Sequence, residues 1–511
     1  MCGVSRPVHA RVGRPVHVPA GTANALACLT MEPSSVIDRS VDASREHSPY
    51  TGQAPASPAG PVEDTEPLHA PPSVPLPRAV QTLRFTKRQI QFVFAARRRL
   101  GEVFQVRFVV IPGGVVVTSH PDHVRSLFTA KPELVPSLTA ESPLRPIVGP
   151  NSVLTANGPS HLRQRKLLLP AFHGEAIEGY AQMIRDVTER ELDRWPVGRP
   201  FALAPRMQAI TLDVIMSGIF GIEGAPARGT TEHRLRATIK QLAAASTSPM
   251  ALLGELSNLG REKPVGPTRA AVTLLDRATY PVIEERRRAA DLDERGDILS
   301  LLLRATGEDG ERMTDHELRD ELLTLVLAGF ETTANSLAWT WERLVRTPAA
   351  YERLRDAVRS DAQAAEHVEA AIVEGMRSRP VIPIVGRRVA VPWRLGEYVV
   401  PAGQGVSISI LLVHHREDLY PDPFAYRPER WLEHEGGRAP GTYEWLPFGG
   451  GTRRCLGAAL AMAEQRVVLE AMVRRLDLEA DRPEPEHAHH RNVTMIPGRG
   501  ARVILRSRIA G

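Results

Sequence analysis

The residue with the most distinctive chemistry is a cysteine in a glycine-rich stretch near the C-terminus. Cys455 follows the sequence Phe-Gly-Gly-Gly-Thr-Arg-Arg, which begins at Phe448, and precedes an apolar helix predicted from Leu456 to about Arg475. Glycines allow positive φ angles and a close approach to a flat ligand. The N–H groups and partial positive charge of the helix N-terminus favour the thiolate over the thiol. With no second cysteine nearby, the stretch is a poor zinc or disulfide site, and it suits the single thiolate ligand of a haem iron.

A second stretch places residues of low helix propensity in the middle of a predicted helix. A capping box at its start predicts a long helix over about residues 314–346. The centre, residues 325–333, reads Leu-Val-Leu-Ala-Gly-Phe-Glu-Thr-Thr. Apolar flanks predict burial, yet Gly329 and two threonines cost helix stability, and the hydroxyl of Thr332 can bond back to a carbonyl. Such an exception inside a buried helix often marks a functional site.

Two pairs of polar residues stand at helical spacing elsewhere. His161 and Arg165 are four residues apart, so they share a helix face and can both donate to one anionic group. Taken alone, this pair is better explained as an ordinary surface His and Arg. Glu374 and Arg377 are three residues apart and also share one face of a predicted helix.

Helical patterns dominate the chain around these residues. Two β-rich runs, 104–110 and 115–119, flank a Pro-Gly-Gly turn and predict a hairpin, and further strands are expected up to about Ile410. Residues 1–72 are rich in Pro, Ser and Ala and are predicted to be a disordered extension, because they cannot bury enough apolar area. The folded domain is predicted to span residues 73–511.

The composition limits compartment and partners. The 511 residues carry a net charge of +5 that is spread along the chain, so no nucleic-acid footprint is predicted. The three cysteines favour a reducing, cytoplasmic compartment. No apolar run reaches the roughly eighteen residues of a transmembrane helix, and the patch at 25–29 is too short for a signal peptide. No transmembrane anchor is therefore expected.

The cysteine stretch resembles the signature of a known family. Phe448, Gly451, Arg453, Cys455 and Gly457 match the pattern F-x-x-G-x-R-x-C-x-G of the cytochrome P-450 haem-thiolate monooxygenases. Three further motifs match in order and spacing over the whole predicted domain. They are A-G-x-D/E-T-T at residues 328–333, E-x-x-R at 374–377, and P-E-R-F/W at 428–431.

The resemblance implies the roles of individual residues. Haem b would lie between the long helix and the cysteine loop, with Cys455 as the metal ligand. The implied catalytic pair is Thr332, a proton relay, with Glu331. Glu374, Arg377 and Arg430 would form an ion-pair core that braces the loop. The other implied haem-binding residues are His161, Arg165, Arg387, Arg453, Phe448, Gly449, Gly457, Ala328 and Gly329.

Two positions stay open in this comparison. Arg388 replaces Arg387 at the haem propionate if the register slips by one residue. The chain reads His414-His-Arg where the family usually reads His-Arg-Asp, which leaves the role of His415 undecided.

The implied fold is a single, mainly α domain with small β-sheets, of the soluble, bacterial type. The implied reaction is monooxygenation of a small-to-medium apolar organic substrate by O₂. Electrons would come from a separate ferredoxin and a NAD(P)H-dependent ferredoxin reductase, because no flavin or iron–sulfur motif is present in the sequence. The alternatives are a hydrogen-peroxide-driven peroxygenase and a non-catalytic haem sensor or carrier.

Overall fold

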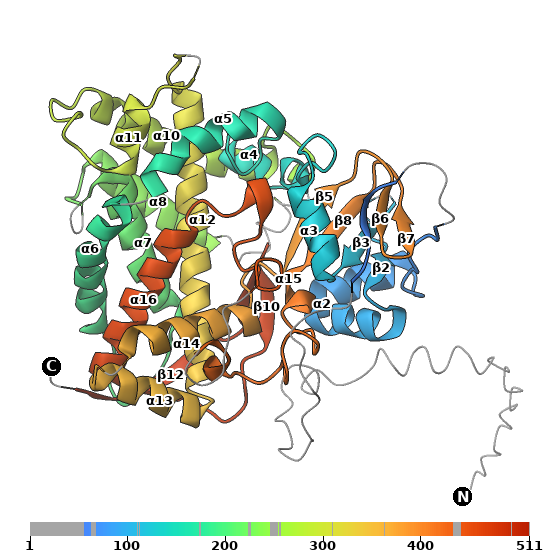
Figure 1. Ribbon diagram of the computed structural model, residues 1–511. Coiled ribbons are helices and arrows are strands. Elements are labelled where there is room, and N and C mark those ends of the chain that lie inside the picture. The colour runs from blue at the N-terminus through green and yellow to red at the C-terminus, as the bar shows by residue number, and fades with distance from the viewer. Residues whose placement is uncertain are drawn as a thin grey trace, which may run out of the picture.

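The computed structural model of the protein describes residues 56–62, 68–109, 111, 113–172, 175–222, 226–245, 254, 257–308, 310–361, 363–432, 441–491 and 493–509. Helices lie mainly on one side of the molecule and small sheets on the other (Figure 1). The prediction of a mainly α fold with small sheets is confirmed.

Helix α12, Asp315–Leu344, runs through the middle of the helical part (Figure 1). The Thr314 side chain accepts a hydrogen bond from the Glu317 N–H, and the Glu317 side chain accepts one from the Thr314 N–H, so the predicted capping box is present. Its 30 residues span about 45 Å. Trp339 and Trp341 are fully buried, because other helices surround α12.

The remaining α-helices pack around α12 or connect it to the sheets. Residues predicted to be core in α7, such as Ile210 and Val214, are buried in a cluster that also contains residues of α12, α14 and α16. The α-helices are α2 (Arg78–Leu100), α3 (Pro121–Thr129), α4 (Arg145–Val148), α5 (Gly158–Leu168), α6 (Glu175–Leu192), α7 (Ala204–Phe220), α8 (Thr231–Ala245), α10 (Gly266–Arg287), α11 (Ile298–Arg304), α13 (Pro348–Arg359), α14 (Ala364–Ser378), α15 (Ile410–Val413) and α16 (Ala458–Arg475). Short 3₁₀ helices are η2 (Leu138–Glu141), η3 (Leu169–Phe172), η4 (Pro428–Trp431) and η6 (Gly451–Arg453).

The largest sheet described has four strands in the order β2-β3-β8-β5. The predicted hairpin is formed by β2 (Val103–Val106) and β3 (Val115–Thr118), and β3 pairs in parallel with β8 (Gly405–Ser409). β5 (Ile384–Arg388) pairs antiparallel with β8 at the edge. The other strands are β4 (Pro200–Ala202), β9 (Leu476–Ala480) and β12 (Arg502–Arg508) in one sheet, β10 (Ala488–Arg491) and β11 (Thr494–Pro497) in a hairpin, and β1 (Ala59–Pro61), β6 (Trp393–Leu395) and β7 (Tyr398–Val400) in a third sheet.

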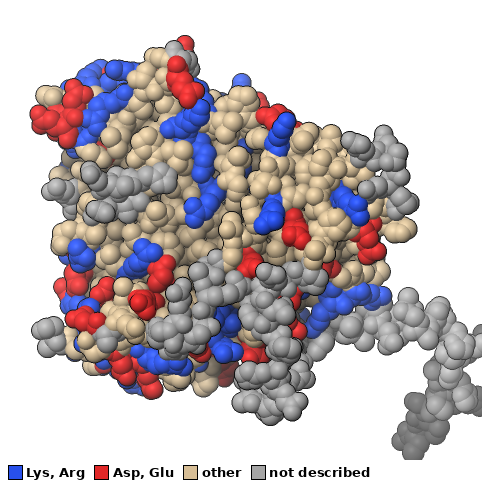
Figure 2. All heavy atoms as spheres, in the orientation of Figure 1, with Lys and Arg blue, Asp and Glu red and all other residues tan. Residues whose placement is uncertain are grey.

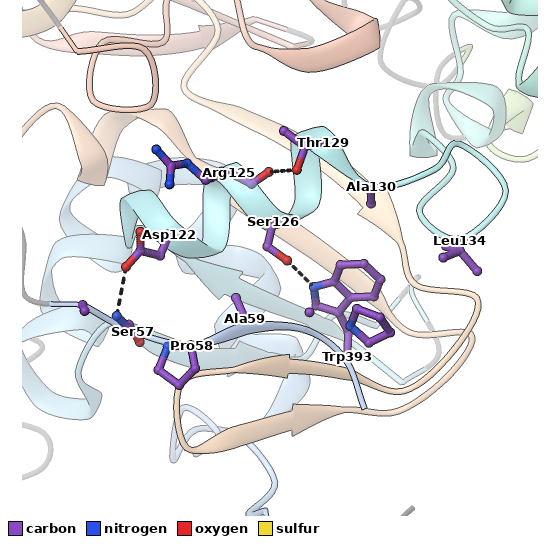
Figure 3. A pocket seen from close by; sticks show the side chains of 13 residues that line it. Ser57, Pro58, Ala59, Asp122, Arg125, Ser126, Thr129, Ala130, Leu134 and Trp393 are labelled. Atoms are coloured by element: carbon purple, nitrogen blue, oxygen red, sulfur yellow. Dashed lines mark hydrogen bonds between the residues drawn. The ribbon is translucent and has the colours of Figure 1, made fainter. Parts of the chain in front are cut away.

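Strand β1 lies inside the segment that was predicted to be disordered. It pairs antiparallel with β6, and His69 forms a further bridge with Tyr398. The Ser57 N–H donates to Asp122 Oδ2 at 2.9 Å, so this segment and α3 together line a surface hollow of about 700 Å³ (Figure 3). Folded structure therefore begins before residue 73, and the boundary predicted at residue 72 is too late. Residues 1–55 lie outside the described residues.

Candidate functional site

The cysteine loop packs closely against the end of α3. Gly451 has φ +63°, and a Cβ atom at this position would lie 1.9 Å from the carbonyl oxygen of Phe128, so no other residue type fits. The Cys455 N–H donates to the Phe448 carbonyl at 2.9 Å, which closes the loop just before α16. Leu456 packs in the same apolar cluster as Leu325 of α12. Helix α16, which follows the loop directly, also contacts α12.

The Cys455 side chain is accessible, although protein surrounds it. Burial raises the pKa of its thiol, whereas the Gly457 N–H and the cations Arg165 and Arg454 act to lower it. Accessibility and enclosure are compatible when a side chain faces open space inside a fold rather than packed neighbours. The nearby donor and cations are groups that stabilise a thiolate.

Four basic side chains gather beside the cysteine loop. His161 and Arg165 come from α5, Arg387 from β5, and Arg453 from η6. Burial lowers the pKa of His161 to about 4, and the positive charges of Arg453, Arg165 and Arg387 add to the effect. Burial also lowers the pKa of Arg387 and that of Arg453 to about 10 each.

This cationic cluster, which we define as His161, Arg165, Arg387 and Arg453, lacks a counter-ion in the described part of the chain. None of its members forms an ion pair with a carboxylate there. All three arginines bond backbone oxygens instead: Arg165 Nη1 donates to Arg454 O at 2.7 Å, Arg453 Nη1 to Val153 O at 3.2 Å, and Arg387 Nη1 to Gly386 O at 3.0 Å. The charges of the three arginines repel one another, whereas His161 with its lowered pKa is neutral near pH 7, so the cluster is suited to a bound dianion.

The register of β5 separates the two candidate arginines. Arg387 lies 5.3 Å above the Phe128 ring, and its charge contributes to the lowered pKa of His161. Arg388 points to the other face of the strand, where it forms an ion pair with Glu141 and bonds the Gly403 carbonyl. The geometry therefore favours Arg387, and not Arg388, as the arginine of β5 that belongs to the cationic cluster.

The centre of α12 presents an accessible polar turn, Ala328–Thr332, within an otherwise buried helix. Ala328 is exposed, and Glu331 and Thr332 are partly exposed. The Thr332 hydroxyl donates to the Ala328 carbonyl at 2.6 Å, which is the back-bond that the sequence suggested. A Cβ on Gly329 would lie 2.5 Å from Ile215 Cδ1. Helix α7 therefore packs against Gly329 too closely to leave room for a larger side chain unless Ile215 moves.

Glu331 is held by the β10–β11 hairpin. Its Oε1 accepts hydrogen bonds from Arg491 Nε at 2.9 Å and from Thr494 Oγ1 at 3.4 Å. Arg491 also forms an ion pair with the same carboxylate. The sequence analysis missed Arg491, because nothing in the local pattern links it to a residue 160 positions earlier.

A buried ion-pair core lies behind the cysteine loop. Arg377 donates two hydrogen bonds to Glu374, each 2.8 Å long, and both side chains are fully buried. Arg430 Nε donates to Glu374 Oε1 at 3.2 Å. Both arginines implied by the resemblance thus contact Glu374. Trp431 adds a fourth contact, from Nε1 to Glu374 Oε2 at 3.0 Å.

His414, which the sequence analysis assigned no role, joins this core to the loop. Its carbonyl accepts from Arg377 Nη1 at 2.7 Å, and its Nε2 accepts from the Leu446 N–H at 2.7 Å. Burial lowers the pKa of His414 to about 3, so the ring is neutral. His415, whose role was undecided, is buried between Phe94 and Phe424, which is a packing role.

Comparison with known proteins agrees with this arrangement. The model of the cytochrome P-450 family matches residues 69–503. A Mycobacterium tuberculosis protein provisionally named cytochrome P-450 138 is 37% identical over 454 residues, which cover 89% of this chain and 99% of the relative. Another, provisionally named cytochrome P-450 137, is 35% identical and covers 86% and 92%.

The fold also matches a solved structure. The cyanobacterial CYP120A1 bound to retinoic acid superposes with a TM-score of 0.72 at 23% identity, covering 86% of this chain and all of that one. In the described part of the chain, no helix is both long and apolar enough to cross a membrane. The family match spans most of the sequence, and the cysteine loop, the cationic cluster and the central helix all fall within it. The chain belongs to the cytochrome P-450 family.

Proposed function

We propose that the protein is a haem-dependent monooxygenase. The observation that supports this most directly is the cationic cluster beside Cys455, which has no carboxylate partner in the described residues. Haem b carries two propionates, so its two negative charges would offset the repulsion within the cluster. A single cysteine at this position would supply one thiolate ligand to the iron. The donor set of this site therefore fits haem b.

The residues that would hold haem b fall into three sets, for the iron, the propionates and the ring. Cys455 would ligate the iron, and His161, Arg165, Arg387 and Arg453 would bind the propionates. The accessible face of Ala328 and the residues Phe448, Gly449 and Gly457 would lie along the flat surfaces of the ring. Haem bound through a thiolate activates O₂ with two electrons, so that one oxygen atom enters the substrate and the other leaves as water.

Proton delivery is the task that the chain itself must perform at the polar turn. The interior of α12 has its backbone N–H groups in helical hydrogen bonds, so a side chain has to present the proton. Thr332 Oγ1 is a hydroxyl at the accessible turn, and it bonds only the Ala328 carbonyl among described residues. It can turn from that carbonyl to donate, and a water can return the proton. Glu331, fixed by Arg491, would orient that water.

The substrate is proposed to be a small-to-medium apolar molecule. Near the polar turn, Leu325 is partly exposed, and Val493 is 44% exposed at the tip of the hairpin that holds Glu331. Apolar side chains with accessible surface in such a position favour an apolar ligand.

Electrons are proposed to come from a ferredoxin, reduced by a NAD(P)H-dependent reductase, in the cytoplasm. Lys and Arg side chains lie along α5, next to the cysteine loop, on the face seen in Figure 2. One of them, Lys166, has a side chain that is 61% exposed and forms a surface ion pair with Glu308 at 2.8 Å, which an acidic carrier would have to displace. A basic surface attracts an acidic carrier and raises the association rate.

The test is a reconstitution with isotopically labelled O₂. Candidate apolar ligands are first screened by the change that they cause in the haem absorption spectrum. The best ligand is then incubated with the full chain, ferredoxin, reductase and NADPH. We expect a product that carries one labelled oxygen atom and depends on ferredoxin.

Two parallel reactions separate the alternatives. Faster product formation from hydrogen peroxide alone than from the complete electron-transfer system would replace the proposal by a peroxygenase. If no ligand is oxidised by either route although ligands shift the spectrum, the haem would serve binding rather than turnover.

A further inference from the structure

A polar cavity of about 320 Å³ lies among α6, α7 and α8, which stand side by side in Figure 1. None of the residues implicated in the haem site lines it. Its charged lining comes from all three helices and the residue that follows α6: Arg190, Glu191, Arg194, Asp213, Arg236 and Lys240. The lining therefore carries two more positive than negative charges.

Both carboxylates of the cavity already have partners. Glu191 Oε1 accepts from Arg206 Nη1 at 3.1 Å and from Trp195 Nε1 at 3.3 Å, and Glu191 is buried. Asp213 forms an ion pair with Arg236. Each acid is thus paired with one arginine of the cavity wall, Glu191 with Arg194 at 3.6 Å and Asp213 with Arg236.

Arg190 and Lys240 provide the excess charge. Among the described residues, neither forms an ion pair with a carboxylate. Partial burial lowers the pKa of Lys240, and Arg236 adds to this, whereas Asp213 and Glu191 act in the opposite direction. Arg190 and Lys240 are both exposed, so an anion in the cavity can reach them, and the attraction between opposite charges would favour its binding.

We propose that this cavity binds a small polyanion of the phosphate class, such as a polyphosphate or a sugar phosphate. Arginine guanidinium groups match phosphate oxygens in pairs, and three of the four cations are arginines. Since one water takes about 30 Å³, the cavity has room for roughly ten water-sized groups. That is enough for pyrophosphate and lies at the lower end of the range for ligand pockets.

Helix α7 connects this cavity to the centre of the molecule. Ala209 and Asp213 line the cavity, whereas Thr211, about half a turn away, donates to the Phe330 carbonyl of α12 at 2.7 Å. Ile215 lies on the same side as Thr211 and packs against Gly329. An anion that joins α6, α7 and α8 would therefore stabilise the helix that supports the polar turn of α12.

The test uses the haem-loaded full chain and pyrophosphate as the probe. Isothermal titration at constant ionic strength, balanced with chloride, should show saturable binding at one site, and the melting temperature should rise with pyrophosphate. The double variant Arg190→Gln/Lys240→Gln should weaken binding at least tenfold. Its matched control, Lys87→Gln/Arg98→Gln, removes one lysine and one arginine from the exposed face of α2 and should leave binding unchanged.

A charge-preserving variant and a membrane arm complete the test. Arg190→Lys/Lys240→Arg should retain most of the affinity, which excludes a general loss of folding. Absence of saturable binding, or equal weakening in the α2 control, would overturn the proposal. Sedimentation with anionic phospholipid vesicles that depends on Arg190 and Lys240, without pyrophosphate binding, would also overturn it and assign the surface to a membrane.

Discussion

The charge of an arginine near Cys455 should destabilise the haem-free protein and strengthen the binding of haem. Arg387 is 7% exposed, has no carboxylate partner in the described structure, and adds positive charge to His161 and Arg453. Without haem, the charge of Arg387 is a source of repulsion. With haem, the same charge is proposed to bind a propionate. One substitution can therefore separate the two states.

Arg387→Gln should accelerate haem loss by about tenfold while leaving the apoprotein as stable as before, or more stable, because a charged contact to the haem is worth roughly 1.5–3 kcal/mol. The measurements are the rate of haem transfer to an excess of a haem acceptor protein and the melting temperature of the apoprotein. The control, Arg388→Gln, breaks an exposed pair with Glu141, worth under about 1 kcal/mol, and an exposed hydrogen bond to the Gly403 carbonyl. Equal haem retention in both variants would remove Arg387 from the site.

Thr332→Ala should uncouple the enzyme without loss of haem or substrate binding. NADPH would still be consumed, but product per NADPH should fall by roughly tenfold and hydrogen peroxide should rise, since a positioned proton donor contributes at least that much. Thr332→Ser keeps the hydroxyl and should restore most of the coupling. An unchanged yield in the alanine variant would show that Thr332 is not the proton donor and would direct attention to Thr333.

The site residues that could be predicted from the sequence are those that belong to short motifs. Cys455, Thr332 and the Glu374–Arg377 pair stand in short patterns whose spacing places them on a loop or a helix face. Arg491 and His414 could not be found in this way. Their partners, Glu331 and Leu446, lie 160 and 32 positions away and meet them only after the chain has folded.

At the scale of elements, α12 was predicted within two residues at each end because its signals are local. The capping box marks its start, and the apolar flanks continue without interruption. Strand β1 was missed for the opposite reason. Three residues in a segment rich in Pro and Ala show no strand pattern, and they are held by β6 and α3, which are distant in the sequence.

The first 72 residues are expected to divide into a dispensable and a structural part. Removal of residues 1–55 should leave haem content and melting temperature unchanged, since a stretch so rich in Pro, Ser and Ala buries little apolar area. Removal of residues 1–72 also deletes β1 and the Ser57 bond to Asp122, and should lower the melting temperature by several degrees. Both truncations are compared with the full chain by haem absorbance and thermal melting. Identical melting of all three proteins would contradict a structural role for β1.

At the scale of the whole molecule, two buried carboxyl groups make stability depend on pH. Burial raises the pKa of Glu321, on α12, and that of Glu464, on α16, to about 8 each. Both values lie above those of the unfolded chain. The stabilising contribution is therefore complete at acidic pH and is lost as the pH rises through about 8.

Between about pH 7 and about pH 8.5, the free energy of unfolding should fall by roughly 1 kcal/mol for each of the two carboxyl groups. Glu464→Gln should remove about half of this decline, which urea unfolding of the haem-loaded protein at the two pH values can measure. Glu141→Gln, at an exposed position, is the control and should leave the decline as it is. A stability that is constant over this range would show that the two carboxyl groups find charge partners on folding.

The central claim is that Cys455 holds the haem iron as a thiolate. Its most direct test is the absorption spectrum of the reduced carbon-monoxide complex, recorded for the full chain, for Cys455→His and for Cys28→Ser as the matched control. We predict a red-shifted Soret band in the full chain and in the control, and its loss in Cys455→His with haem still bound. A red-shifted band that persists in Cys455→His, or that is absent from the full chain, would contradict the account.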